Sequence, residues 1–534
     1  VLDGVNLDFD EVGVYIGGNA IFSNSAQLNM LNSILEIVNG SLALDINVNF
    51  AVNGTNVTVV GGSLSSTDNV NVDFISSYLH VEGDVVFDGS LLSSYDFVDS
   101  IFEIVDGGDL LLSGNTTASF TDSEGFILGG SLSVIESTTL TTSSSSINLE
   151  GTGTLNVLGT GHIILENGSL LSVVTAGASA NFADETHLEI YHDSTFNLTG
   201  GNIQFDNSAV FDLWEGTNIN ILGGSFLLSE SASMTAYPFT EGTIVGGNFH
   251  IVDDAAVTFI SSNIRIVGAL NSTSSVPVQF LNGTTITVDG APVTISGNAT
   301  LYLTNQTELH VFDGSVILTD TASIFSDGAN ILVFGGSILA YDDTSITASA
   351  GSNFVITGGN VTTSDNSLFL VTGGSTLVVS QNVTTGTQGS VYIQGSSSFV
   401  IDDNSFLIID GGNLELFEHS SFTTSFGSVI SITAGDLLIG EYISFTSAAG
   451  SLLEILDGGS FLACGPGVVL RFDQGRTVIG GGDLIICLRT VMFSEQSSFE
   501  VFNSGKVLLT DLSRSFLSDS TVNVYGGGDF EIAR

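Results

Sequence analysis

The segment Gly200-Gly201-Asn202-Ile203-Gln204-Phe205 recurs at a constant spacing, as Gly223-Gly224-Ser225-Phe226-Leu227-Leu228 and again as Gly246-Gly247-Asn248-Phe249-His250-Ile251. The second and fourth positions after each glycine pair are apolar, whereas the first and third are mostly small or polar. An alternation with a period of two is typical of a β-strand with one buried face. The repeat therefore predicts a short strand after each glycine pair, at intervals of about 23 residues.

The same spacing extends along most of the chain. Glycine pairs occur at 17–18, 61–62, 107–108, 129–130, 200–201, 223–224, 246–247, 335–336, 358–359, 373–374, 411–412, 458–459, 480–482 and 526–528. Turn dipeptides such as Asn39-Gly40 and Asp289-Gly290 fill most of the missing positions. The spacing falters between about 360 and 410, where we expect an irregular coil or an inserted loop.

A repeat unit of this length has room for three short strands and three turns. We therefore predict an all-β fold, a single-stranded parallel β-helix with about 23 residues per coil, as one continuous solenoid over residues 1–534. On coil length and turn chemistry, the sequence resembles the right-handed parallel β-helices shared by pectin-lyase-like enzymes, bacterial autotransporter passengers, filamentous adhesins and phage tailspikes. The resemblance implies strands stacked about 4.8 Å apart and a continuous core in which each coil is stabilised by its neighbours.

The charge balance excludes one class of partner. The chain has 57 acidic residues and 7 basic ones, its only lysine is Lys506 and its first arginine is Arg265. Nucleic-acid binding needs clustered Lys and Arg, so we expect no nucleic-acid partner. No run of 18 apolar residues occurs, so we expect no transmembrane segment.

The catalytic patterns of carbohydrate-active β-helices do not fit the sequence. Polygalacturonase-like enzymes carry carboxylate pairs followed by Gly-His-Gly and Arg-Ile-Lys motifs, but Gly161-His162 here precedes Asp253-Asp254, Asp342-Asp343 and Asp402-Asp403, and no Arg-x-Lys occurs. Pectate-lyase-like catalysis needs an arginine base, and Arg265 is the only arginine before residue 471. We therefore predict no catalytic residues and a protein that is not an enzyme.

Acidic residues recur at one slot of the coil, six residues after the glycine pair. They are Asp68, Glu136, Glu230, Asp253, Asp342, Asp365 and Glu418. Stacking would place Glu230 above Asp253 and Asp342 above Asp365, and like charges at such a distance repel. The column is interpreted either as a solvated acidic edge or as a set of weak calcium sites formed by these two pairs; no other cofactor is expected.

The two cysteines occupy the same slot in successive coils. Cys464 and Cys487 are one repeat apart, each five residues after a glycine pair. Stacking would bring their Cα atoms to about 4.8 Å, within the range for a disulfide. We predict a disulfide in an oxidising compartment, with a reduced packing pair as the alternative.

Twelve Asn-x-Ser/Thr sequons are candidates for N-glycosylation in a secreted protein. They are Asn39, Asn53, Asn56, Asn115, Asn167, Asn197, Asn271, Asn282, Asn298, Asn305, Asn360 and Asn382.

The glycine spacing begins by Gly17 and is still present at Gly528. We therefore expect either a segment of a longer solenoid or ends that join neighbouring copies head to tail, since such contacts build filaments. The leading hypothesis is a secreted or cell-surface structural protein of a filament, appendage or coat, whose partners are copies of itself or adjoining solenoid segments. The alternatives are a cell-surface adhesin or receptor-binding β-helix and, third, a polysaccharide lyase or hydrolase.

Overall fold

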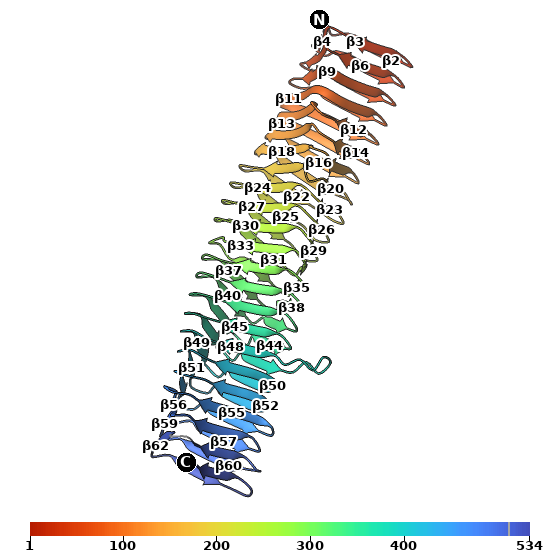
Figure 1. The fold of residues 1–534 in the computed structure, drawn as a ribbon. Helices are drawn as coiled ribbons and strands as arrows, with labels where there is room; N and C mark the ends of the chain where they lie inside the picture. Colours follow the sequence, from red (N-terminus) through yellow and green to blue (C-terminus); the bar gives the residue numbers. More distant parts are fainter. Residues whose placement is uncertain (511–512, 534) are drawn as a thin grey trace. The chain divides into compact units, whose positions relative to one another are not determined.

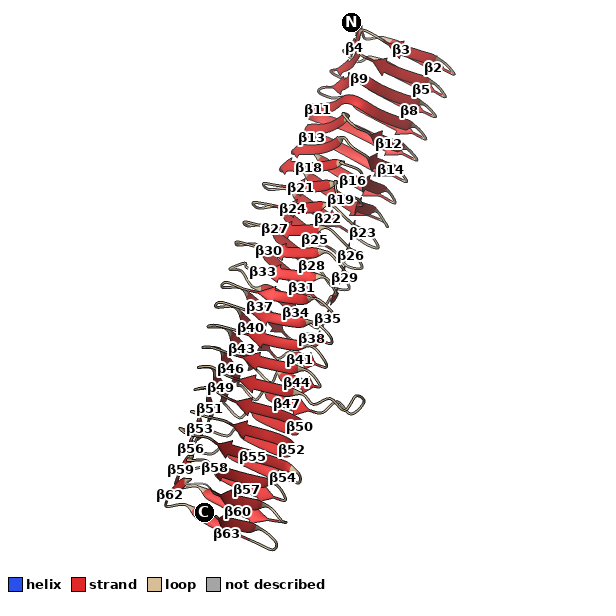
Figure 2. Ribbon diagram, viewed as in Figure 1, coloured by secondary structure: helices blue, strands red, loops and turns tan. Residues whose placement is uncertain are grey.

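The computed structural model describes residues 1–510 and 513–533, with residues 90–92 described by their backbone alone. Strands and turns account for all the regular structure in this part of the chain, and no helix occurs in it (Figure 2). No helix that could span a membrane is therefore found among the described residues. The prediction of an all-β parallel solenoid with the expected coil length is confirmed.

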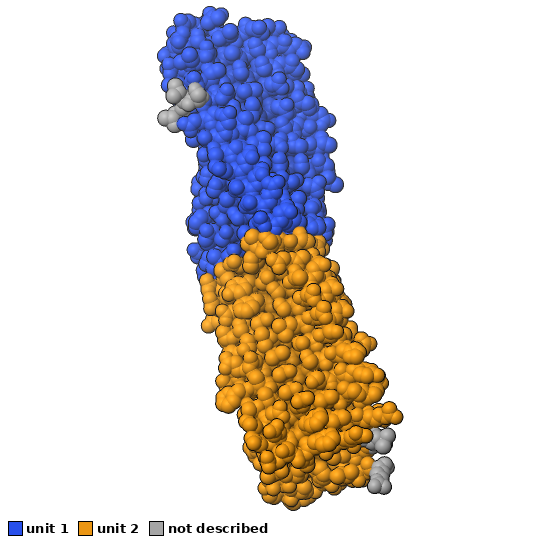
Figure 3. All heavy atoms as spheres, turned by 90° about the vertical axis from the view of Figure 1, so that its left-hand side faces the viewer, with its two compact units in different colours: residues 1–263 blue, residues 264–534 orange. Residues whose placement is uncertain are grey.

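The chain forms two compact units, Val1–Asn263 and Ile264–Arg534 (Figure 3). Each unit is a stack of three-stranded coils. In unit 1, one coil consists of β24 (Asn202–Phe205), β25 (Val210–Leu213) and β26 (Asn218–Ile221). We call these the first, second and third strands, and we call the turn between the first and second strands the first corner and that between the second and third strands the second corner.

Each strand pairs in parallel with the equivalent strand of the next coil (Figure 1). β24 pairs with β27 (Ser225–Leu228), and β27 pairs with β30 (Asn248–Ile251), so that Ile203, Phe226 and Phe249 are direct partners. In unit 2, β39 (Ser315–Leu318) pairs in the same way with β42 (Ser337–Ala340). The spacing of the glycine pairs in the sequence thus matches the number of residues that separates paired positions in neighbouring coils.

Inward side chains form a dry core of stacked aliphatic and aromatic residues. Phe182 and Phe205 are fully buried, and their rings stack 4.5 Å apart. Phe226 follows at 5.5 Å from Phe205, and Phe249 at 5.0 Å from Phe226. Burying an aromatic side chain contributes about 1.5–3 kcal/mol, so the core stabilises each coil only when its neighbours are present.

A ladder of buried hydroxyl groups runs along the second corner of unit 1. The backbone N–H of each member donates to the side-chain hydroxyl of the next member, one coil further on, at 3.0–3.2 Å. The members are Ser33, Thr55, Ser77, Ser100, Ser123, Ser145, Ser169 and Ser194. Because a buried N–H without a partner is costly, this hydroxyl ladder stabilises the corner by giving each of these N–H groups an acceptor.

The coils depart from the common pattern at two places. In unit 1, β11 (Tyr78–Val98) runs without interruption through almost a whole coil. In unit 2, a hairpin protrudes between β47 (Thr376–Ser380) and β48 (Ser390–Ile393), closed by a bridge between Gln381 and Gln388 (Figures 1 and 2). This hairpin falls inside the interval for which the sequence predicts an inserted loop.

Candidate functional site

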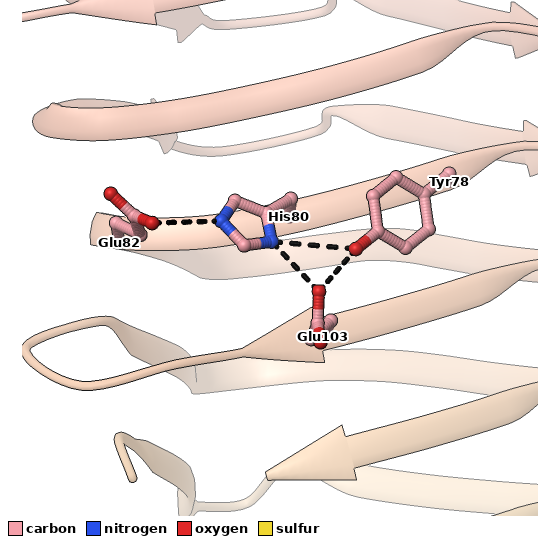
Figure 4. A network of polar contacts seen from close by, with 4 residues as sticks. All are labelled: Tyr78, His80, Glu82 and Glu103. Atoms are coloured by element: carbon pink, nitrogen blue, oxygen red, sulfur yellow. Dashed lines mark hydrogen bonds and ion pairs between the residues drawn. The ribbon is translucent and has the colours of Figure 1, made fainter. Parts of the chain in front are cut away.

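A polar network covers part of an outward face of unit 1 (Figure 4). Tyr78, His80 and Glu82 extend from β11, and Glu103 extends from β12 (Ile101–Ile104) in the next coil. His80 and Glu103 are direct partners across the two coils. His80 Nδ1 lies 2.9 Å from Glu103 Oε2, His80 Nε2 lies 3.2 Å from Glu82 Oε1, and the Tyr78 hydroxyl donates to Glu103.

The pKa values of His80 and Glu103 are shifted in the directions that favour an ion pair between them. Burial lowers the pKa of His80, but its hydrogen bonds to Glu103 and Glu82 outweigh burial and leave the pKa raised. The Tyr78 hydroxyl and then His80 lower the pKa of Glu103 against the effect of burial. Burial and the bond to Glu103 raise the pKa of Tyr78 to about 12. Each group thus serves as a partner for another, and the network is suited to joining two coils.

A second cluster combines stacked aromatic rings with carboxylates. Tyr191, Trp214 and Tyr237 follow the second strands β22 (His187–Ile190), β25 and β28 (Ser233–Ala236). The rings of Tyr191 and Trp214 stack 5.3 Å apart at 6°, and those of Trp214 and Tyr237 stack 4.3 Å apart at 4°. Because each face of Trp214 is covered by a tyrosine, the stack presents ring edges outward.

Carboxylates lie beside this aromatic stack. Glu189 and Asp212 are direct partners on β22 and β25. The Tyr191 hydroxyl donates to Glu189 Oε2 at 2.8 Å, and His162 Nε2 lies 3.2 Å from the same oxygen. Burial and then Glu189 raise the pKa of Asp212. The pair can accept hydrogen bonds from a ligand that approaches the ring edges.

The cysteine prediction agrees with the structure. Cys464 and Cys487 are direct partners on β55 (Gly459–Cys464) and β58 (Asp483–Cys487), and they form a disulfide with a Cα–Cα distance of 4.7 Å. The bond links two successive coils at the first corner of unit 2.

The acidic column lies at the first corners, where two of its carboxylates accept backbone hydrogen bonds. Glu230, Asp253, Asp342 and Asp365 all have left-handed φ angles of 55–62°. Asp253 Oδ2 accepts from the backbone N–H of Glu230 at 3.4 Å, and Asp342 Oδ2 accepts in the same way from Asp320. These carboxylates therefore hold one corner against the next.

Calcium gains no further support at these positions. Within residues 1–510 and 513–533, no group of three or more His, Cys, Asp or Glu side chains is arranged to hold a metal ion. Calcium favours six to eight oxygen ligands, and each pair of the column offers two carboxylates. The calcium hypothesis stays a prediction.

None of the twelve sequon asparagines is buried. Nine are exposed, and Asn197, Asn271 and Asn382 are partly exposed. Asn382 lies in the protruding hairpin of unit 2, where its Oδ1 accepts from the backbone N–H groups of Thr384 and Thr385 at 2.9 and 3.2 Å. Glycans at these positions stay a prediction.

Neither side-chain cluster of unit 1 is among the predicted sites, although the sequence contains a signal for both. His80 and Glu103 are one coil length apart in the sequence, as are Glu189 and Asp212, Tyr191 and Trp214, and Trp214 and Tyr237. The one-coil spacing that identified the cysteine pair would also have placed these side chains side by side.

Comparisons with known proteins add little to this description. No family model matches the chain, and no curated protein shows significant similarity to it. Among solved structures, a PL6-family alginate lyase aligns over the whole chain and 97% of its own length, with 8% identity and a TM-score of 0.16. A score this low carries no argument about function.

Proposed function

We propose that this protein is a non-enzymatic structural component of an extracellular filament, appendage or surface coat. In this proposal its copies assemble head to tail, or the solenoid continues in adjoining segments. The observation that carries the proposal is the unbroken coil-to-coil pairing within each unit. Strands, core and corners all bond along the direction of stacking, as in solenoids whose stability comes from neighbouring repeats.

Side-chain contacts support this reading because they join neighbouring coils. Arg476 forms a two-bond ion pair with Glu500 in the next coil, at 2.8 and 3.1 Å, and Lys506 Nζ lies 3.4 Å from Glu531. The His80–Glu103 pair and the disulfide do the same. Exposed ion pairs contribute at most about 1 kcal/mol each, so their importance lies in fixing the register between coils.

The extracellular location is part of the proposal. A disulfide persists in oxidising compartments, and the sequon asparagines reach the surface. Residues 1–264 contain no Lys or Arg, so trypsin-like proteases have no cleavage site there. These features suit a protein exposed outside the cell.

Electron microscopy of the native material tests the function. A regular polymer with one dominant longitudinal repeat is expected. Single tethered rods would favour the adhesin alternative, and cleavage of an acidic polysaccharide by the purified chain would contradict the non-enzymatic proposal. An intact mass equal to the bare 55.3 kDa would exclude glycosylation.

The adhesin alternative has one observation in its favour. The stack of Tyr191, Trp214 and Tyr237 lies beside Glu189 and Asp212 on an outward face of unit 1. Aromatic side chains are enriched in binding surfaces. If the stack serves adhesion, replacing Tyr237 with Ala should abolish binding of the native protein to its target surface and should leave the rods themselves intact in electron micrographs.

A further inference from the structure

A groove of about 780 Å³ opens at the first corner of unit 2. It is lined by a three-by-three grid of residues from three successive coils, 394–396, 417–419 and 440–442. These segments follow the strands β48, β50 (Phe406–Leu416) and β52 (Val429–Ile439). Its volume lies within the range of small-molecule sites.

Small residues create the hollow. Gly440 lies between Phe417 and Cys464 in the column of corner residues, and a Cβ atom placed on it would be 3.0 Å from Phe417 Cδ1. Gly395 and Ser396 occupy the same corner in the coil before. The shape of the groove therefore depends on the missing side chain at Gly440, where the coil before carries Phe417.

Three aromatic rings line the hollow, those of Phe417, His419 and Tyr442. The rings of His419 and Tyr442 stack at 5.0 Å and 24°. Phe417 is 37% exposed and Tyr442 is 51% exposed. Glu418, His419 and Tyr442 have left-handed φ angles of 53–68°.

Two carboxylates, Glu418 and Glu441, form the middle column of the grid, one coil apart. Both are exposed, and neither has a hydrogen-bond or ion-pair partner within the described residues. By contrast, Glu103 and Glu500 each have a cationic partner in a neighbouring coil. Like charges in successive coils repel each other, and a cation bound between them would relieve this repulsion.

We propose that this groove binds an organic cation, an alkylammonium or guanidinium group, held between Glu418 and Glu441 and flanked by aromatic rings. The rings decide the class of cation. Ring faces near carboxylates suit ammonium and guanidinium groups, whereas calcium is bound by oxygen ligands and gains no comparable contact from three aromatic rings in the lining. The proposal does not depend on the structural function proposed above.

Calorimetric titration of the full chain at low ionic strength tests the site. We use N-acetyl-arginine methylamide as the guanidinium probe, tetramethylammonium as the ammonium probe, and the citrulline analogue of the first as a neutral match. Binding with a Kd of about 1 mM is expected for a cationic probe, and at least about tenfold weaker binding for the citrulline analogue. The tighter of the two cationic probes shows whether the groove prefers a guanidinium or an ammonium group.

Variants assign the binding to the grid. Glu441→Gln and Tyr442→Ala should each weaken binding about fivefold or more, and Tyr442→Phe should retain it within about twofold because the ring remains. Tyr341→Ala is the matched control, since Tyr341 precedes Asp342 and Asp343 at the same corner of another coil and lies outside the groove. It should leave binding unchanged.

Three results would overturn the proposal. They are equal binding of the citrulline analogue, displacement of the probe by calcium at lower concentration than by either cation, and unchanged binding in both Glu418→Gln and Glu441→Gln. If Tyr442→Ala lowers the melting temperature, the isosteric Glu441→Gln variant decides the outcome alone.

Discussion

The Tyr78–His80–Glu103 network of unit 1 and the groove of unit 2 use the same three kinds of side chain in different ways. In unit 1 they extend from paired strands, so His80 and Glu103 meet directly across two coils. In unit 2, Glu418, His419 and Tyr442 lie at corners with left-handed φ angles, and Glu418 and Glu441 find no partner among the described residues. Of these two places, the strand face of unit 1 pairs its polar groups across coils, whereas the corner of unit 2 leaves two carboxylates available to a ligand.

The largest expected loss of stability follows from removing the disulfide in the coils after the groove. Replacing both Cys464 and Cys487 with serine opens a loop of 23 residues, and loop-closure entropy predicts a loss of about 3 kcal/mol. Urea unfolding followed by circular dichroism should show unit 2 unfolding at lower denaturant concentration.

Trp214, the single tryptophan, lies in unit 1 and provides the control for this variant. Its fluorescence transition should stay in place while the other transition moves. An equal shift of both transitions would mean that the two units unfold together. The two units would then not differ in stability.

A smaller loss is expected from the hydroxyl ladder next to the unit 1 network. Ser100→Ala leaves the buried N–H of Ser77 without its acceptor and removes the bond from the Ser100 hydroxyl to the Phe74 carbonyl. The expected cost is about 1–3 kcal/mol in denaturant unfolding. Ser94→Ala, which removes an exposed bond to Asn71, is the matched control and should cost under about 0.5 kcal/mol.

The pH dependence of the unit 1 network provides a third test. The raised pKa of His80 stabilises the fold below the ordinary value of 6.5, and this contribution is lost as pH rises through the folded-state pKa. The lowered pKa of Glu103 stabilises the fold above 4.5, and this contribution is lost as pH falls through the folded-state pKa. The network therefore contributes most between pH 4.5 and 6.5.

Glu103→Gln should lower the pKa of His80 in an NMR titration and reduce the change in stability across neutral pH. Glu82→Gln removes the weaker and more exposed partner, so it should have the smaller effect. A His80 pKa that stays the same in Glu103→Gln would show that the network is not held by this ion pair.

The smallest effect is expected from filling the groove. Gly440→Ala places a methyl group 3.0 Å from Phe417 Cδ1, so the ring must shift by a few tenths of an ångström. We expect stability to change by about 0.5 kcal/mol and affinity for the cationic probe to fall about twofold. Gly526→Ala, where the added methyl group has open space around it, is the control.

The fold and the disulfide could be predicted because both follow from spacing alone. Glycine pairs give the coil length. The two cysteines of the chain, Cys464 and Cys487, occupy the same position in successive coils, so the sequence predicts that they lie side by side. The hydroxyl ladder follows the same spacing, but serine and threonine are so common here that its members did not stand out.

The groove could not be predicted, because its shape depends on conformation as well as spacing. The sequence places Phe417 and Gly440 in one column, but it does not say that the ring lies over the glycine or that His419 stacks on Tyr442. For the acidic column, the sequence shows only that like charges are stacked. In the structure, Asp253 and Asp342 of this column also accept backbone hydrogen bonds at left-handed corners, a role that charge counting misses.

The hydroxyl ladder also bears on how such a chain can change length during evolution. The hydroxyl group of each serine or threonine accepts a hydrogen bond from a backbone N–H of the coil before it. Its own backbone N–H donates to the hydroxyl group of the coil after it. Duplicating or deleting one coil-length block that starts at such a hydroxyl would bring together two new neighbours able to form the same bond. Between Ser33 and Ser194, the gain or loss of a whole coil by recombination within the gene would therefore leave each second corner with its hydroxyl acceptor.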